Sequence, residues 1–124
     1  MSNVSCSYTD PRDGKARPAT VSVIGVVDDD ESVRDALSSL IRSAGYQCVL
    51  FPSAEAFLES GGPSNTDCTV LDIRMAGLSG LELQLRLREM RCSIPIIFVT
   101  GHADEVKRDQ ALKNGAVAFL SKPF

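Results

Sequence analysis

The sequence contains no tryptophan, a single histidine and no long run of apolar residues. A helix that spans a bilayer needs about 20 consecutive apolar residues, so no membrane contact is expected. The N-terminal residues are polar and lack the apolar centre of a secretory signal, which favours a cytoplasmic location. The four cysteines form no CxxC pair, and this spacing argues against a zinc site.

Basic residues are also too few to suggest nucleic acid binding. Lys and Arg number 13 against 16 Asp and Glu, which gives a formal net charge of -3. A protein that binds nucleic acid needs a basic surface to offset the phosphate charges. We therefore expect no direct nucleic acid contact by this segment.

The first twenty residues contain almost no large apolar side chains and are interrupted by Pro11, Gly14 and Pro18. They predict a flexible N-terminal tail at 1–20. The remaining residues, 21–124, are enough for one domain with one core.

Short apolar runs alternate with helical patterns from residue 21 onward. The runs are rich in β-branched residues, which is typical of buried strands, and they lie at 21–27, 48–51, 68–72, 94–100 and 116–120. The segments between them predict four helices, at about 33–44, 53–60, 81–90 and 104–113. Strands that alternate with helices predict an α/β fold, a doubly wound five-stranded parallel sheet with helices on both faces.

Polar residues follow these strands where each strand ends. Asp28 and Asp29 follow the first strand, Asp72 ends the third, Thr100 ends the fourth and Lys122 follows the fifth. The carboxyl ends of parallel strands meet at one edge of the sheet, where ligands bind. Several carboxylates at this edge need a cation to stay ionised together, and Mg²⁺ suits such a half-open cluster of oxygen ligands.

These residue types fit phosphoryl transfer to an aspartate. An aspartate can act as a nucleophile and form an acyl phosphate, and the reaction needs mainly positioning and charge neutralisation. Lys122 and Mg²⁺ would supply positive charge, and the Thr100 hydroxyl can donate a hydrogen bond to a phosphoryl oxygen.

Four segments, in the order VVDDDESVR, VLDIRMAGLSG, IIFVTGHAD and AVAFLSKPF, resemble the motifs of receiver domains of two-component response regulators. The resemblance covers residues 21–124. The Thr-Gly-His segment after the fourth strand is similar to that of a subgroup of receivers that control a helix-turn-helix output. It implies a flavodoxin-like receiver fold and a switch that is phosphorylated by a sensor histidine kinase. Such a switch is not an enzyme in the usual sense, although it assists its own phosphorylation and dephosphorylation.

The resemblance also implies a role for each matching residue. Asp72 would be the phosphoacceptor, while Thr100 and Lys122 would contact the phosphoryl group. The implied metal ligands are Asp72, Asp29, Asp28 through a bound water, and the backbone carbonyl of Arg74. Thr100 and Phe119 would form the conformational switch, and Lys122-Pro123 is similar to the family's cis peptide.

Two departures from the family pattern are visible. Met75 is followed by Ala76 where the family usually has proline, which predicts a looser loop without loss of a ligand. Family members also continue into a fifth helix, whereas this sequence ends at Phe124. We therefore expect a C-terminally truncated receiver domain that lacks the fifth helix. It would cover the exposed apolar face by self-association or rearrangement, or be marginally stable.

Two other functions stay open from the residues alone. A metal-dependent phosphatase with an aspartyl nucleophile favours a second Asp two residues later, where this sequence has Arg74. A degenerate receiver that only binds proteins would not need Asp72, Thr100 and Lys122 together.

The expected partners are a sensor histidine kinase, an output domain C-terminal to this segment that acts in transcription, and a second copy of the phosphorylated chain. The predicted helix at 104–113 is the expected mobile element, because Val106, Ala111 and Leu112 are its only clear apolar anchors.

Overall fold

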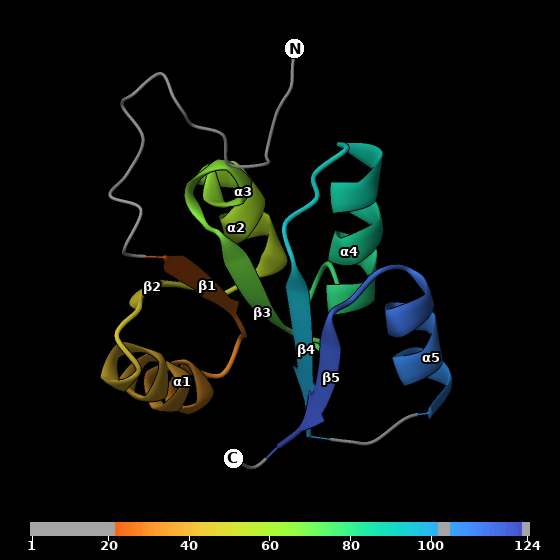
Figure 1. The fold of residues 1–124 in the computed structure, drawn as a ribbon. Coiled ribbons are helices and arrows are strands. Elements are labelled where there is room, and N and C mark those ends of the chain that lie inside the picture. The colour runs from red at the N-terminus through yellow and green to blue at the C-terminus, as the bar shows by residue number, and fades with distance from the viewer. Residues whose placement is uncertain (1–21, 102–104, 123–124) are drawn as a thin grey trace.

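The computed structural model describes residues 22–101 and 105–122 (Figure 1). The predicted tail at 1–20, His102 of the Thr-Gly-His segment, and Pro123 of the predicted cis peptide lie outside the described residues.

Five parallel strands form one sheet, in the order β2-β1-β3-β4-β5. Their bounds are β1 Val23–Val27, β2 Gln47–Phe51, β3 Cys68–Asp72, β4 Ile96–Thr100 and β5 Ala118–Ser121. The chain leaves β1 for β2 at one edge and then returns past β1 to build β3, β4 and β5. The point where the direction changes lies between β1 and β3, and in this class of fold such a point is where ligands bind. The predicted doubly wound parallel sheet is confirmed.

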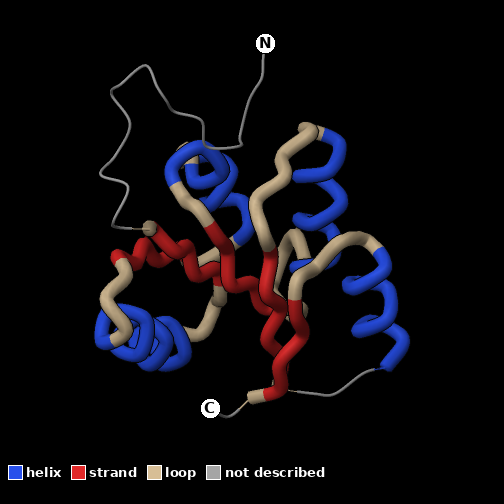
Figure 2. The backbone as a smooth tube through the Cα atoms, in the orientation of Figure 1, coloured by secondary structure: helices blue, strands red, loops and turns tan. Residues whose placement is uncertain are grey.

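The helices lie on both faces of the sheet (Figure 1, Figure 2). Their bounds are α1 Glu31–Ser43, α2 Ala54–Glu59, α3 Gly62–Asn65, α4 Gly80–Glu89 and α5 Glu105–Lys113. On one face, Leu37 and Ile41 of α1 pack with Val26 and Val70 of the sheet. On the other face, a larger core joins residues of α2, α4 and α5 to the sheet, with Phe57, Leu83, Leu87 and Phe98 fully or almost fully buried.

The described residues contain one more helix than the sequence predicted. The extra element is the single turn α3, which begins directly after Gly61, whose φ is 78°. The segment Gly61-Gly62-Pro63 both separates α3 from α2 and begins α3. Proline in the first turn also favours a new helix, because its fixed φ suits that position and its missing N–H has no partner there.

Most boundaries agree with the prediction within two residues. Strand β4 begins at Ile96, although the apolar run begins at Ile94. Pro95 interrupts the run, because it has no N–H to give to a neighbouring strand.

Two of the three expected anchors of the charged helix are exposed. Val106 of α5 is 76% exposed and Leu112 is 36% exposed, whereas Ala111 is fully buried. The prediction that Val106 and Leu112 anchor this helix was therefore wrong. No helix in the described ranges is both long and apolar enough to cross a membrane.

Candidate functional site

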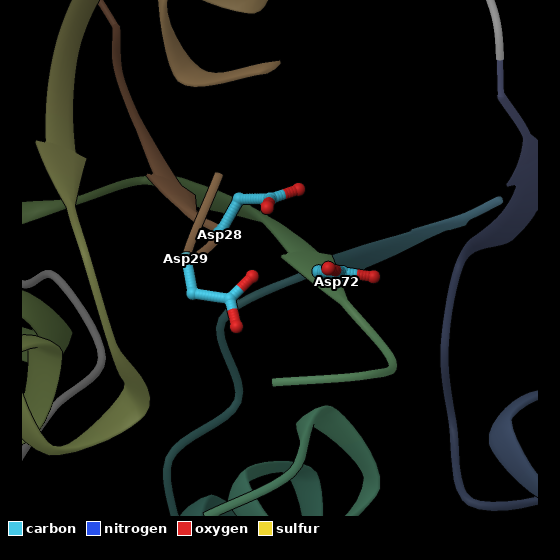
Figure 3. A group of neighbouring side chains, drawn as sticks. All are labelled: Asp28, Asp29 and Asp72. Atoms are coloured by element: carbon cyan, nitrogen blue, oxygen red, sulfur yellow. The ribbon is translucent and has the colours of Figure 1, made fainter. Parts of the chain in front are cut away.

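Three aspartates gather at the carboxyl ends of β1 and β3. These strands are adjacent and parallel, with Val27 paired to Leu71, so Asp28 and Asp72 leave the sheet side by side. Asp28, Asp29 and Asp72 each offer one carboxylate oxygen within 4.8 Å of the others (Figure 3). Asp28 and Asp72 are buried, and Asp29 is exposed. The predicted acidic cluster is therefore present.

The start of α1 fixes the first of these aspartates. The Asp28 Oδ1 atom accepts a hydrogen bond from the Asp30 backbone N at 2.9 Å. Asp30 is in turn the N-cap of α1 and accepts from Ser32 N at 2.9 Å, which satisfies a helical N–H that has no partner within the helix. Arg34, one turn into α1, donates from Nη1 to the Asp28 carbonyl at 2.8 Å.

Lys122 brings a positive charge to the cluster from the end of β5. Its Nζ atom lies 3.0 Å from Asp28 Oδ2 and 3.6 Å from Asp72 Oδ2. Its backbone N donates to the Thr100 carbonyl at 2.7 Å, which continues the β4–β5 pairing past the end of the strands. Thr100 is itself buried at the end of β4. The structure therefore brings Lys122 into the acidic cluster and Thr100 to the same edge.

The charges in this cluster do not balance. Burial, and next the negative charge of Asp28, raise the pKa of Asp72 from 3.8 to about 6, although Lys122 acts in the opposite direction. Burial also lowers the pKa of Lys122, but the hydrogen bond to Asp28 and the proximity of Asp72 outweigh it and raise that pKa. Among the described residues, one ammonium group faces three carboxylates. A further cation would offset the remaining negative charge of the cluster.

The donor set fits Mg²⁺. Three carboxylates offer hard oxygen ligands, and exposed Asp29 leaves one side of the cluster open to solvent, as an ion that keeps its waters requires. Arg74, the fourth predicted ligand, lies two residues after Asp72. Its backbone N donates to Asp72 Oδ1 at 3.3 Å, which holds the loop that carries its carbonyl against the cluster.

Phe119 lies away from the carboxylates, in β5. It is partly buried against the larger core, and its ring centroid lies 6.3 Å from that of Phe98 in the neighbouring strand β4. Its pairing partner in the sheet is Phe98, two residues before Thr100.

Three residues that support the site were not predicted from the sequence. Arg34 is a partly buried residue of α1 at the edge of its apolar stripe, and it donates to the Asp28 carbonyl. Gly80, the first residue of α4, packs so closely on the Asp72 carbonyl that a Cβ atom would collide with it. Glu55 of α2 accepts a hydrogen bond from Leu78 N at 2.9 Å in the loop that follows Asp72. Only Gly80 carried a signal, because glycine is unfavourable within a helix and is used where the backbone must approach another group closely.

Comparison with known proteins gives consistent matches. A family model described as response regulator receiver domain matches residues 24–124. Nodulation protein W of Bradyrhizobium diazoefficiens is 48% identical over 111 residues, which is 90% of this chain and 49% of that protein. Transcriptional regulatory protein FixJ of the same organism is 45% identical over 101 residues, which is 82% of this chain and 49% of that protein. This chain thus spans about half the length of the curated relatives that it matches.

The fold agrees with a solved relative. The structure of FixJ-N superposes with a TM-score of 0.76 at 38% identity, covering 83% of this chain and 82% of that chain.

Proposed function

The chain belongs to the response regulator receiver domain family, and from this premise we propose that it is a phosphorylation-dependent switch. Asp72 accepts a phosphoryl group from a sensor histidine kinase in a Mg²⁺-dependent reaction, within a receiver unit formed by residues 21–124. The observation that carries the proposal is the placement of buried Asp72 at the sheet's switch point, beside two further aspartates and Lys122.

The residues of the chain divide the chemistry between them. A carboxylate oxygen of Asp72 forms the new O–P bond while the P–N bond of the donor phosphohistidine breaks. The electron pair of the P–N bond stays on the imidazole nitrogen, which leaves as the free histidine of the kinase. Lys122 holds positive charge 3.6 Å from Asp72 Oδ2, where the phosphoryl oxygens would gather. The Thr100 hydroxyl donates to one of these oxygens. Asp28, Asp29, Asp72 and the Arg74 carbonyl would hold Mg²⁺, which offsets the negative charge of the carboxylates and the phosphoryl group.

The conformational response passes from Thr100 to Phe119 and α5. Thr100 turns toward the new phosphoryl group and leaves space into which the ring of Phe119 moves. Phe119 packs on the core that includes Ala111, the buried residue of α5, so its movement changes the contacts that hold this helix.

The output is transcriptional and lies in a region C-terminal to this segment. Relatives that are named as transcriptional regulatory proteins, and that are about twice as long as the matched segment, support this assignment. The phosphorylated chain also pairs with a second phosphorylated copy of itself to form a homodimer.

Chemical phosphorylation tests the proposal directly. The metal-free protein is incubated with acetyl phosphate, with and without Mg²⁺, and its mass is measured over time. A stable gain of one phosphoryl group that requires Mg²⁺ is expected in the wild type and in Asp35→Asn, a control at an exposed aspartate of α1. Asp72→Asn is nearly isosteric and should gain nothing.

Other outcomes identify the alternatives. Rapid turnover of acetyl phosphate without accumulation would indicate a phosphatase. No uptake at all would indicate a receiver that serves only as a protein-binding module. Uptake by Asp72→Asn at the wild-type rate would place the phosphoacceptor elsewhere.

A further inference from the structure

Two carboxylates from other elements hold the loop 73–79 between β3 and α4. Ala76 N donates to Asp29 Oδ2 at 3.2 Å, and Leu78 N donates to Glu55 Oε2 at 2.9 Å. Glu55 lies in the first turn of α2, 23 positions before Leu78 in the sequence. The loop is therefore joined to α2 on one side and to the acidic cluster on the other.

The loop backbone is shaped to receive the Glu55 carboxylate. Gly77 has a φ of 76°, in the left-handed region that favours glycine. A Cβ atom at this position would lie 2.7 Å from Glu55 Oε2, so only a glycine lets the carboxylate approach this closely without a shift. The hydrogen bond from Leu78 lowers the pKa of Glu55, because it favours the ionised form of the carboxyl group. An ionised acceptor forms a stronger hydrogen bond than a neutral one.

The loop needs such a support because of Ala76. Proline, which the receiver pattern usually has here, fixes its own φ and restricts the residue before it. Alanine leaves both residues more conformational freedom, which has to be lost when the loop takes one shape. Alanine also supplies the N–H that reaches Asp29, a hydrogen bond that proline cannot make.

We propose that Glu55 is a positioning residue of the metal site. By holding Leu78 N it fixes the loop that carries both the Arg74 carbonyl and the Ala76 N–H, and so orients Asp29 and Arg74 for Mg²⁺. Glu55 acts through the loop and is not one of the three carboxylates within 4.8 Å of one another. This inference rests on the proposed function, because it concerns the same Mg²⁺ site.

The test compares Glu55→Gln with Glu59→Gln, an equal charge change at another exposed glutamate of α2. Mg²⁺ is titrated into each metal-free protein and followed by the amide resonances of the loop. Glu55→Gln should raise the Kd for Mg²⁺ by about tenfold, as the loss of an outer partner of metal ligands does elsewhere. Glu59→Gln should leave the Kd close to the wild-type value.

A second measurement reads the loop itself. Amide hydrogen exchange at Leu78 should be about tenfold faster in Glu55→Gln, because the loop then opens more often. The amides of α1 should exchange at the wild-type rate, which distinguishes a loosened loop from a destabilised protein.

The outcomes separate this inference from the proposed function. If the wild type binds Mg²⁺ and both variants bind it equally well, the role of Glu55 is refuted, even with faster exchange at Leu78, and the proposed function stands. If the wild type neither binds Mg²⁺ nor takes up a phosphoryl group, the proposed function fails and this inference fails with it.

Discussion

Replacing Asp72 with asparagine should stabilise the metal-free protein at neutral pH. Burial and the nearby charge of Asp28 raise the pKa of Asp72 from 3.8 to about 6. A group whose pKa is raised on folding favours the folded state below its unfolded pKa, and this contribution is lost as the pH rises through the folded value. A shift of about two pKa units corresponds to a cost of up to about 3 kcal/mol when the carboxylate is ionised.

Asparagine removes the charge and keeps the contacts. Its Oδ1 atom can still accept from Arg74 N, and Lys122 keeps its closer partner, Asp28, at 3.0 Å. We therefore expect the free energy of unfolding of Asp72→Asn to exceed that of the wild type by about 2 kcal/mol above pH 6.5. The difference should shrink between pH 6 and pH 4, to about 0.5 kcal/mol at pH 4, because the folded wild type then binds the proton.

Urea unfolding in EDTA at pH 7.5, 5 and 4 measures the difference, and Asp35→Asn is the control for an exposed aspartate. Added Mg²⁺ should reduce the advantage of Asp72→Asn at pH 7.5, because the ion stabilises the wild type more than a variant that lacks a ligand. A variant that is less stable than the wild type at pH 7.5, or a difference that does not change with pH, would refute the electrostatic reasoning.

Four further outcomes are expected. Asp29→Ala removes one carboxylate from the cluster and should weaken Mg²⁺ binding by about tenfold or more in a titration; equal affinity would contradict its role as a ligand. Amide exchange should be faster in α5, which buries only Ala111, than in α1, and should change on phosphorylation; equal and unchanged protection would count against α5 as the mobile element. Arg91→Gly should raise the free energy of unfolding by about 1 kcal/mol, because Arg91 has a φ of 61°; no gain in urea unfolding would show that the arginine is not strained. Gly80→Ala should lower the free energy of unfolding by about 3 kcal/mol or more, because the new Cβ would collide with the Asp72 carbonyl. A much smaller loss of stability in urea unfolding would mean that α4 can shift away from this carbonyl.

The strand ends were predictable from the sequence because two simple regularities agree there. A continuous apolar run marks a strand buried on both faces, and the first polar residue after it marks the edge of the sheet. Asp28 after β1 and Asp72 at the end of β3 satisfy both, and parallel pairing brings them together without further information. The acidic cluster therefore follows from the strand ends once β1 and β3 are neighbours in the sheet.

The supporting contacts could not be predicted in the same way, because they join side chains to backbone groups of distant loops. The sequence marks Glu55 only as an ordinary acidic residue in the first turn of a helix, and nothing around it points to a distant loop. What distinguishes it is that the Leu78 N–H and the bare backbone of Gly77 lie opposite its carboxylate. Such a contact depends on the path of a loop, and apolar periodicity says nothing about that path.

The charged helix α5 shows a different limit of sequence reasoning. Apolar residues in a helix predict burial only if the helix presents them to a core, and a short helix with scattered apolar positions has no single apolar face. Val106, Ala111 and Leu112 are such a set, and only the smallest of them, Ala111, reaches the core. The helix is instead held by polar contacts to α4, where Gln84 donates from Nε2 to the Ala111 carbonyl at 2.9 Å and Arg88 donates to Asn114 Oδ1 at 3.0 Å. An element whose buried side chain is as small as that of Ala111 can be displaced at a lower cost than α1, which buries Leu37 and Ile41. The weak apolar pattern that hides from the sequence which α5 residues are buried is also consistent with its proposed role as the moving part of the switch.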